Sequence, residues 1–314
     1  MEVYESVHRV ELNLPFQETP ILNVYIIKNN SSAAIIDTGM GDAASNQLLI
    51  KGVEEIGLRK NDISLIINTH EHVEHFSGNY ELAKATGAQI VAHPIAKKTI
   101  EKPSMRFSEE AVLKMLPEGA LEQIRRWSTL FNVVKPSTVA KIVKDGDTFE
   151  PVEGIKLRVI HTPGHSQGHI CLYDEDRKAL FSGDQVLGSG TPYVGKWPDG
   201  SNGDMDDYLA SLEKLKKLNL KLILPGHGPI VTEPYERIQD TIERKMKRED
   251  MIIRSLRSDR SKDLFALTRE VYGGPRGEVY YYSSCVLAYL SRLKKQGKAD
   301  YTFDGSKILC KLTE

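Results

Sequence analysis

The sequence has few cysteines, no long apolar run and no signal-peptide pattern. Its 314 residues include three widely spaced cysteines, so a disulfide framework is not expected and a reducing compartment is favoured. No run approaches the roughly 18 apolar residues that a membrane-spanning helix needs. The N-terminus has neither a basic region nor an apolar stretch behind it. We therefore expect a cytoplasmic protein that does not enter a membrane.

An excess of charge of either sign is also lacking. The 42 Lys and Arg residues nearly balance the 43 Asp and Glu residues, which leaves a net charge of −1. This balance excludes a strongly basic tail for nucleic acid, and an apolar content of 40% excludes a disordered chain. The length allows one large domain or two smaller ones.

Short apolar runs typical of strands alternate with segments of helical spacing over residues 1–257, which we expect to form the first domain. The run at 63–67 is typical of a strand that is covered on both faces. Residues 96–135 lack strand signals, and their apolar positions predict an insertion of one or two helices. The pattern as a whole indicates an α/β protein.

The last segment, residues 258–314, has a different pattern. Two stretches of helical spacing precede an alternating stretch with a turn near 304–305. Helices followed by a small hairpin indicate a winged-helix-like C-terminal domain. Acidic residues partly balance its lysines and arginines, so the segment is only mildly basic.

Three histidines and an acid follow the predicted strand at 63–67. His70, His72 and His75 lie within six residues, with Glu74 among them. Neutral imidazole binds zinc, iron, cobalt and nickel, and a carboxylate adds charge that favours a divalent ion. A solvated polar turn is the alternative, but three of the nine histidines in the chain is a large share for a turn. The spacing predicts a metal site at the carboxyl edge of a sheet.

Four further polar residues also follow strand ends. Asp37, His165, Asp184 and His227 each lie close to glycine or proline, which permit tight loops where the backbone approaches a site closely. A lone histidine in a loop is more often structural than a ligand. Together, at successive strand ends, these residues point to one composite site.

The order and spacing of these motifs resemble the metallo-β-lactamase superfamily over about residues 7–250. The resemblance implies an αββα sandwich, in which two mixed sheets lie back to back with helices outside and the site at one edge. The C-terminal segment is similar to the winged-helix appendage of the glyoxalase-II-like and β-lactamase-like-protein-2 branch. The matching motifs are Asp37-Thr-Gly, His70-x-His72-x-Glu74-His75, Thr162-Pro-Gly-His165, Ser182-Gly-Asp184 and Gly226-His227-Gly.

The resemblance implies a site for two divalent ions, zinc or else iron or manganese. Asp37 would orient ligands, and His169 matches a position that is usually structural. Tyr193 lies in a glycine-rich loop after Asp184 and could donate to a leaving group. The implied ligands are His70, His72 and His165 for the first ion, Glu74, His75 and His227 for the second, and Asp184 as a bridge between them.

Glu74 departs from the family pattern, which has aspartate at this position. Glutamate is one methylene longer, so its carboxylate reaches roughly 1.5 Å further. The second ion could therefore shift, bind weakly or be absent, with Glu74 acting only as a base in a mononuclear site. Glu71 is an alternative acid, but on an extended segment its side chain should point away from His70 and His72.

The implied activity is hydrolysis by a metal-activated hydroxide, with Asp184 and Glu74 as the catalytic carboxylates. The near-neutral charge and the apolar insertion favour a small acyl substrate, namely a thioester, ester or lactone. An endoribonuclease or phosphodiesterase of the β-lactamase-like-protein-2 type is the alternative, although a phosphate-binding surface should be strongly basic. A non-hydrolytic di-iron redox protein is a third reading, which His72 and the lack of a flavin domain disfavour. The expected partner is a small molecule, and a homodimer is left open.

Overall fold

Strand β3 (Ile21–Lys28) shows why the first sheet is buried on both faces. Val24 and Ile26 point to one side and Tyr25 and Ile27 to the other, and each is at most 2% exposed. Because successive side chains of a strand alternate between faces, such a strand needs apolar cover on both sides. This cover is seen in the computed structural model of the chain. The model describes residues 1–15, 20–103, 134–196, 203–257, 261–273, 279–304 and 307–313.

The first sheet has seven strands of mixed direction, in the order of the sequence. The pairs from β1 to β4 are antiparallel, whereas β4, β5, β6 and β7 run parallel. The carboxyl ends of β4 and β5 therefore lie next to each other at one edge. The strands are β1 (Glu2–Tyr4), β2 (Val7–Asn13), β3, β4 (Ala33–Ile36), β5 (Ile63–Ile67), β6 (Gln89–Ala92) and β7 (Val139–Ile142).

The second sheet has five strands in the order β12-β11-β10-β9-β8. β8, β9, β10 and β11 pair antiparallel, and β12 adds to β11 in parallel. The ends of β11 and β12 thus also share one edge. The strands are β8 (Thr148–Val152), β9 (Ile155–His161), β10 (Ile170–Asp174), β11 (Ala179–Gly183) and β12 (Leu222–Pro225).

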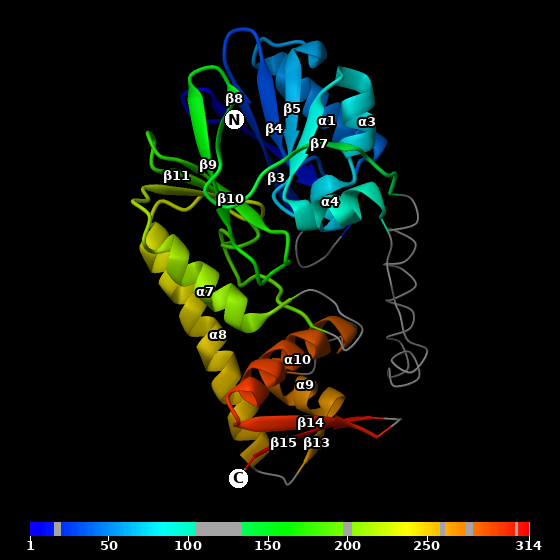
Figure 1. Ribbon diagram of the computed structural model, residues 1–314, viewed down its shortest axis with the longest axis vertical. Coiled ribbons are helices and arrows are strands. Elements are labelled where there is room, and N and C mark those ends of the chain that lie inside the picture. Colours follow the sequence, from blue (N-terminus) through cyan, green and yellow to red (C-terminus); the bar gives the residue numbers. More distant parts are fainter. Residues whose placement is uncertain are drawn as a thin grey trace.

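Helices cover the outer face of each sheet (Figure 1). One apolar cluster joins the first sheet to α1, α3 and α4, a second lies between the two sheets, and a third joins the second sheet to α7 and α8. The predicted arrangement of two mixed sheets with helices outside is therefore confirmed. The elements are α1 (Ala43–Glu55), the 3₁₀ helix η1 (Lys60–Asp62), α2 (Val73–Phe76), α3 (Asn79–Thr86), α4 (Pro94–Glu101), α7 (Met205–Leu215) and α8 (Pro234–Arg257).

The C-terminal segment contains the two helices and the hairpin that its pattern predicts. These are α9 (Leu264–Tyr272), α10 (Val279–Lys295), β14 (Ala299–Phe303) and β15 (Ile308–Leu312), and a short strand β13 (Lys262–Asp263) completes a sheet in the order β13-β15-β14. Buried residues of α9 and α10 belong to the same apolar cluster as those of α7 and α8. The domain boundary after residue 257 and the winged-helix character of the segment stay predictions.

Most of the predicted helical insertion at 96–135 lies outside the described residues, because these omit 104–133. Its first part is observed as α4, which proline begins at the first helical position. Among the helices of the described ranges, none has both the length and the apolar character that crossing a bilayer requires.

Candidate metal centre

Segments that follow strand ends at one edge of the two sheets carry every predicted metal ligand, with Glu74 and His75 in the short helix α2. Asp37 directly follows β4, the 69–75 segment follows β5, and Asp184 follows β11. His165 lies in the loop between β9 and β10, and His227 follows β12. Carboxyl ends of neighbouring parallel strands meet at the same edge, which brings these loops together.

Seven side chains from these segments form two clusters, within each of which the candidate ligand atoms lie no more than 4.8 Å apart. Asp184 belongs to both. Its Oδ1 lies 3.5 Å from Nε2 of both His75 and His227, and its Oδ2 lies 3.6 Å from Nε2 of His165. Ligands at about 2.1 Å from a tetrahedral ion are roughly 3.4 Å apart, so these separations suit two ions that share Asp184. The clusters are His70, His72, His165 and Asp184, and Glu74, His75, Asp184 and His227.

Backbone carbonyl groups orient two of the histidines. His165 Nδ1 donates to the carbonyl oxygen of Tyr193 at 2.5 Å, and His227 Nδ1 donates to that of Ile21 at 2.6 Å. A carbonyl oxygen only accepts hydrogen bonds, so Nδ1 carries the proton and Nε2 keeps its lone pair. Both lone pairs are therefore free to bind a cation beside Asp184.

Asp37 orients two further histidines through a shared network. Its Oδ2 accepts from His75 Nδ1 and from the Thr69 hydroxyl, each at 2.8 Å, and its Oδ1 accepts from the Thr69 amide at 2.8 Å. Because the Thr69 hydroxyl donates to Asp37, it accepts from His70 Nδ1 at 3.0 Å. Asp37 has a φ of 62°, a left-handed conformation in which aspartate is enriched. In the neutral form of each ring, this network holds the proton on Nδ1 and leaves Nε2 of His70 and His75 to face a cation.

The clusters contain polar atoms that lack partners and that a cation would supply. Nε2 of His70 and Nε2 of His165 face each other at 3.2 Å with a lone pair on each. Burial, and then the neighbouring imidazoles, hold the pKa of both histidines well below its usual value, so protonation does not relieve this contact. Within the described part of the chain, the buried atoms His75 Nε2 and Asp184 Oδ1 have no hydrogen-bond partner. The residues thus fit divalent metal ions.

The electrostatics of the second cluster favour a positive charge. Burial alone would raise the pKa of Asp184, but the imidazoles of His227 and His75 outweigh it and hold that pKa well below its usual value. Burial alone would lower the pKa of His75, but the carboxylates of Asp184 and Asp37 raise it well above its usual value. A cation placed between these groups would meet the same favourable field.

His169 bonds the backbone amide of Asp184, and the resemblance predicts a structural role at its position. Its Nε2 accepts from the Asp184 amide at 3.1 Å, and its Nδ1 bonds the Thr162 hydroxyl at 2.8 Å. Burial lowers the pKa of His169 to about 3, which keeps the ring neutral and able to accept this bond. His169 belongs to neither metal cluster.

Glu71 points away from both clusters, as the extended segment predicts. Its carboxylate accepts from the Ser166 hydroxyl at 3.0 Å and from the Gly168 amide at 3.2 Å. A Cβ at Gly168 would lie 2.5 Å from Glu71 Oε2 and 2.6 Å from the backbone nitrogen of Ala96, so glycine is needed at this position. Glu71 thereby holds the loop that carries His165, a contact that the sequence pattern did not predict.

Tyr193 contacts the first cluster through its carbonyl oxygen rather than through its side chain. Its hydroxyl group instead lies 2.6 Å from Ser284 Oγ of α10. A role of this hydroxyl toward a substrate stays a prediction.

Glu74 lies in the second cluster, with its side chain half-buried. No hydrogen bond or ion pair to its carboxylate is found among the described residues, which leaves this carboxylate available to a metal ion or to water. We expect Glu74→Asp to keep or raise the metal content of the second site, because it restores the carboxylate reach of the family pattern. Elemental analysis after dialysis measures this, and Glu81→Asp, which shortens a surface carboxylate paired with Lys135, is the control. A fall to one equivalent of metal in Glu74→Asp alone would contradict the assignment of Glu74 as a ligand.

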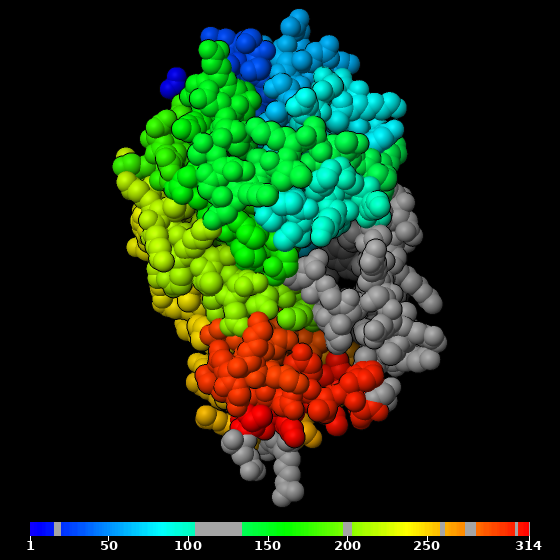
Figure 2. Space-filling view, viewed as in Figure 1, coloured from blue at the N-terminus to red at the C-terminus, as the bar shows by residue number. Residues whose placement is uncertain are grey.

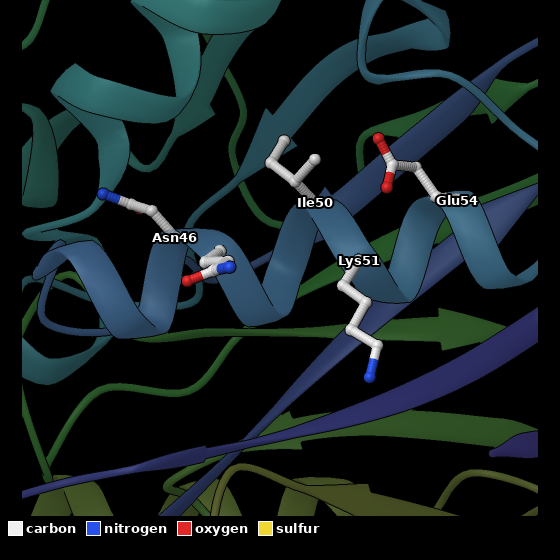
Figure 3. A pocket seen from close by; sticks show the side chains of 5 residues that line it. Asn46, Ile50, Lys51 and Glu54 are labelled. Carbon is white, nitrogen blue, oxygen red and sulfur yellow. The ribbon is translucent and has the colours of Figure 1, made fainter.

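A surface hollow lies elsewhere, on the outer face of α1. It is lined by residues of that helix alone, which include Asn46, Ile50, Lys51 and Glu54 (Figure 3). A hollow formed by one exposed helix face, with neither histidine nor cysteine, offers no chemistry that competes with the loop cluster.

The family of the chain follows from its match to a family model. The model described as "Metallo-beta-lactamase superfamily" matches residues 21–227, which span every ligand loop from the end of β4 to His227. The chain belongs to the metallo-β-lactamase superfamily. With the site described above, it is a hydrolase of the metallo-β-lactamase fold.

Curated relatives of this superfamily member differ in their named activities. A "Beta-lactamase-like protein 2 homolog" from Caenorhabditis elegans is 30% identical over 251 residues, 80% of this chain and 70% of the relative. An "Atrochrysone carboxyl ACP thioesterase" from Aspergillus fumigatus is 29% identical over 236 residues, 75% of this chain and 60% of that protein. The chain thus spans less than two thirds of the thioesterase.

Solved structures share the fold over nearly the whole chain. A metallo-β-lactamase family protein from Thermus thermophilus has a TM-score of 0.83 and 23% identity, covering 98% of this chain and 99% of its own. A β-lactamase domain protein from Burkholderia ambifaria has a TM-score of 0.84 and 19% identity, covering 100% and 94%. Both alignments include the C-terminal segment, so these proteins share its arrangement as well.

Proposed function

We propose that this chain is a metal-dependent hydrolase of a small acyl substrate, a thioester, ester or lactone, with two zinc ions. The carrying observation is the pair of clusters that share Asp184. In them the buried atoms His75 Nε2 and Asp184 Oδ1 have no hydrogen-bond partner among the described residues, and Nε2 of His70 faces Nε2 of His165. His70, His72, His165 and Asp184 would hold one ion, and Glu74, His75, Asp184 and His227 the other. When bound, such ions lower the pKa of a water to near 7 and polarise the substrate oxygen.

The side chains around the site then fix its geometry and transfer protons. His72 and Glu74 are the half-buried members of the clusters, whereas the other ligands are buried, so the open side of the site lies at these two residues. Glu74 can accept a proton from the attacking water and deliver it to the leaving group, because its carboxylate has no other bond among the described residues. Asp184 belongs to both clusters and thereby fixes the position of one cluster relative to the other.

An acyl substrate is favoured over nucleic acid by charge. The chain is nearly neutral overall, and several basic side chains of the C-terminal segment form ion pairs with acidic side chains. A nuclease is the second candidate, supported by the helix–helix–hairpin order of that segment, which we also propose to be a winged helix. The engaged pairs are Arg292 with Glu249 and Asp206, Lys294 with Asp300, and Lys295 with Asp204 and Asp206.

A substrate panel on the metal-stripped and reloaded protein tests the proposal. Acyl thioesters, lactones, simple esters and single-stranded RNA are offered to the same preparation, and elemental analysis gives the metal and its equivalents. We expect zinc-dependent release of thiol or acid from acyl substrates and no cleavage of RNA. RNA cleavage without acyl hydrolysis would instead assign the nuclease, and turnover that persists without metal would overturn both.

A further inference from the structure

The loop from 187 to 196 contacts the metal clusters on one side and the C-terminal segment on the other. At the cluster, the Tyr193 carbonyl oxygen accepts from His165 Nδ1 at 2.5 Å. At the other end of the same residue, the Tyr193 hydroxyl lies 2.6 Å from Ser284 Oγ, which is buried on α10. One residue therefore links a candidate metal ligand to a helix that lies far along the chain, in the C-terminal segment.

The direction of this hydrogen bond is fixed by the contacts of Ser284. The Ser284 hydroxyl donates its proton to the Tyr281 carbonyl at 2.7 Å, so it accepts from the Tyr193 hydroxyl. The ring of Tyr193 stacks on that of Tyr281, with centroids 4.3 Å apart and planes at 26°. The Lys196 amide donates to the Ser284 carbonyl at 3.0 Å. Tyr193 is thus held through its ring, through its hydroxyl group and through the backbone of Lys196 nearby.

Gly195 is required for this contact. A Cβ at Gly195 would lie 1.8 Å from the Tyr193 hydroxyl oxygen and 2.6 Å from Ser284 Oγ. The side chain of Tyr193 therefore folds back over the loop through space that only glycine leaves open.

Contacts from α8 and α10 also hold this loop and the segment before His165. Lys245 of α8 donates to the Pro192 carbonyl at 2.5 Å. Lys295 of α10 pairs with Asp204 at 3.0 Å, and the Asp204 amide donates to the Gly164 carbonyl at 2.9 Å. With the contact of Ser284, the Lys295 pair gives the C-terminal segment two routes to the neighbourhood of His165, and Lys245 holds the same loop from α8.

The apolar core supports the same coupling. Val194 of the loop, Tyr208 of α7 and Val286 of α10 are buried in one cluster. The space-filling view shows the C-terminal segment, orange to red, packed directly beneath the yellow-green chain around α7 (Figure 2). The segment is therefore packed as part of the body that carries the site.

We propose that Ser284, with Tyr281, is a positioning residue for His165, so that the C-terminal segment completes the metal centre. This rests on the proposed metal-dependent function. A histidine whose Nδ1 is bonded to a fixed acceptor keeps both its tautomer and its ring orientation, and loss of such a partner typically weakens metal binding by roughly 10–100-fold. Because Ser284 acts through Tyr193, we expect its loss to give about the lower of these values.

The test compares Ser284→Ala with Ser283→Ala. Ser283 is equally buried on the same helix, and its hydroxyl bonds the Thr268 hydroxyl of α9 at 3.1 Å, away from the loop. Zinc affinity is measured by competition with a chromogenic chelator, and the cobalt-loaded proteins are compared by their visible absorption. We expect Ser284→Ala to bind the zinc of the His70, His72 and His165 cluster about tenfold less tightly and to alter the cobalt spectrum, and Ser283→Ala to do neither.

Tyr193→Phe provides a second variant that leaves the helix untouched. It removes the same hydrogen bond while keeping the stacked ring and the carbonyl group, so it should weaken zinc binding to a similar extent. The double variant should be no weaker than either single one. Equal zinc affinity in wild type, Ser284→Ala and Tyr193→Phe, or equal loss in Ser283→Ala, would overturn the inference, whereas failure of the wild type to bind zinc would overturn the proposed function itself.

Discussion

The Asp184→Asn variant is expected to lose at least about 10³-fold in kcat/KM and to retain at most one equivalent of metal. Asp184 alone belongs to both clusters, and its two oxygen atoms face different histidines. Asparagine has nearly the same shape, but it is neutral and offers one oxygen where the carboxylate offers two. The change therefore removes the shared charge without creating a cavity.

Asp174→Asn is the matched control for this prediction. Asp174 is likewise a buried aspartate, at the end of β10 in the second sheet, but it bonds Arg177 and Tyr4 and lies in neither cluster. Metal content is measured by elemental analysis and activity on the acyl substrate that the panel identifies. Unchanged metal and turnover in Asp184→Asn would contradict the shared-carboxylate site, and an equal loss in Asp174→Asn would show a general effect on folding.

The strands that carry the site were predictable because their burial leaves a strong mark on composition. The run at 63–67 is observed as strand β5 with these same bounds, and the short apolar runs at 33–36 and 89–92 are observed as β4 and β6. A strand covered on both faces must be nearly all apolar, so the first polar residue marks its end. That regularity predicts that Asp37 and the histidine segment lie at one edge of the sheet.

Other elements leave weaker signals in the sequence. The sequence signal of β8 is weak, because Pro151 lies within it and proline cannot donate to a sheet ladder. The strand is found at the edge of the second sheet, where a missing donor is tolerated. α2 is four residues long, too short for a helical period to appear in the sequence.

The partners that orient the histidines could not have been predicted from residue identity. Tyr193 and Ile21 bond His165 and His227 through carbonyl oxygens, which every residue possesses. The contact of Ser284 with Tyr193 depends on how the C-terminal segment packs against α7 and α8. The ligands are therefore visible in the sequence, whereas the groups that fix their tautomers depend on the tertiary structure.

Asp37→Asn tests this distinction, and we expect it to weaken metal binding by on the order of 10²-fold. Asp37 receives three hydrogen bonds, from His75 Nδ1, the Thr69 hydroxyl and the Thr69 amide. An amide cannot accept all three, because either orientation places its NH₂ group against at least one donor. If the NH₂ group faces His75, the proton of that ring moves to Nε2 and the lone pair is lost from the second cluster. The Thr69 hydroxyl then turns toward His70 Nδ1, which forces the same tautomer change in the first cluster.

The two clusters should therefore weaken together in Asp37→Asn, although Asp37 belongs to neither. Imidazole ¹⁵N chemical shifts of the metal-free protein report the tautomers directly, and chelator competition reports the zinc affinity. Asp42→Asn is the control, since Asp42 caps α1 by accepting from the Ser45 amide and asparagine caps a helix about as well. If Asp37→Asn kept its Nδ1–H tautomers and still lost zinc, the network would act through charge alone. If it kept both the tautomers and the affinity, the orienting role of Asp37 would be wrong, because the histidines would then be held by their backbone and packing contacts.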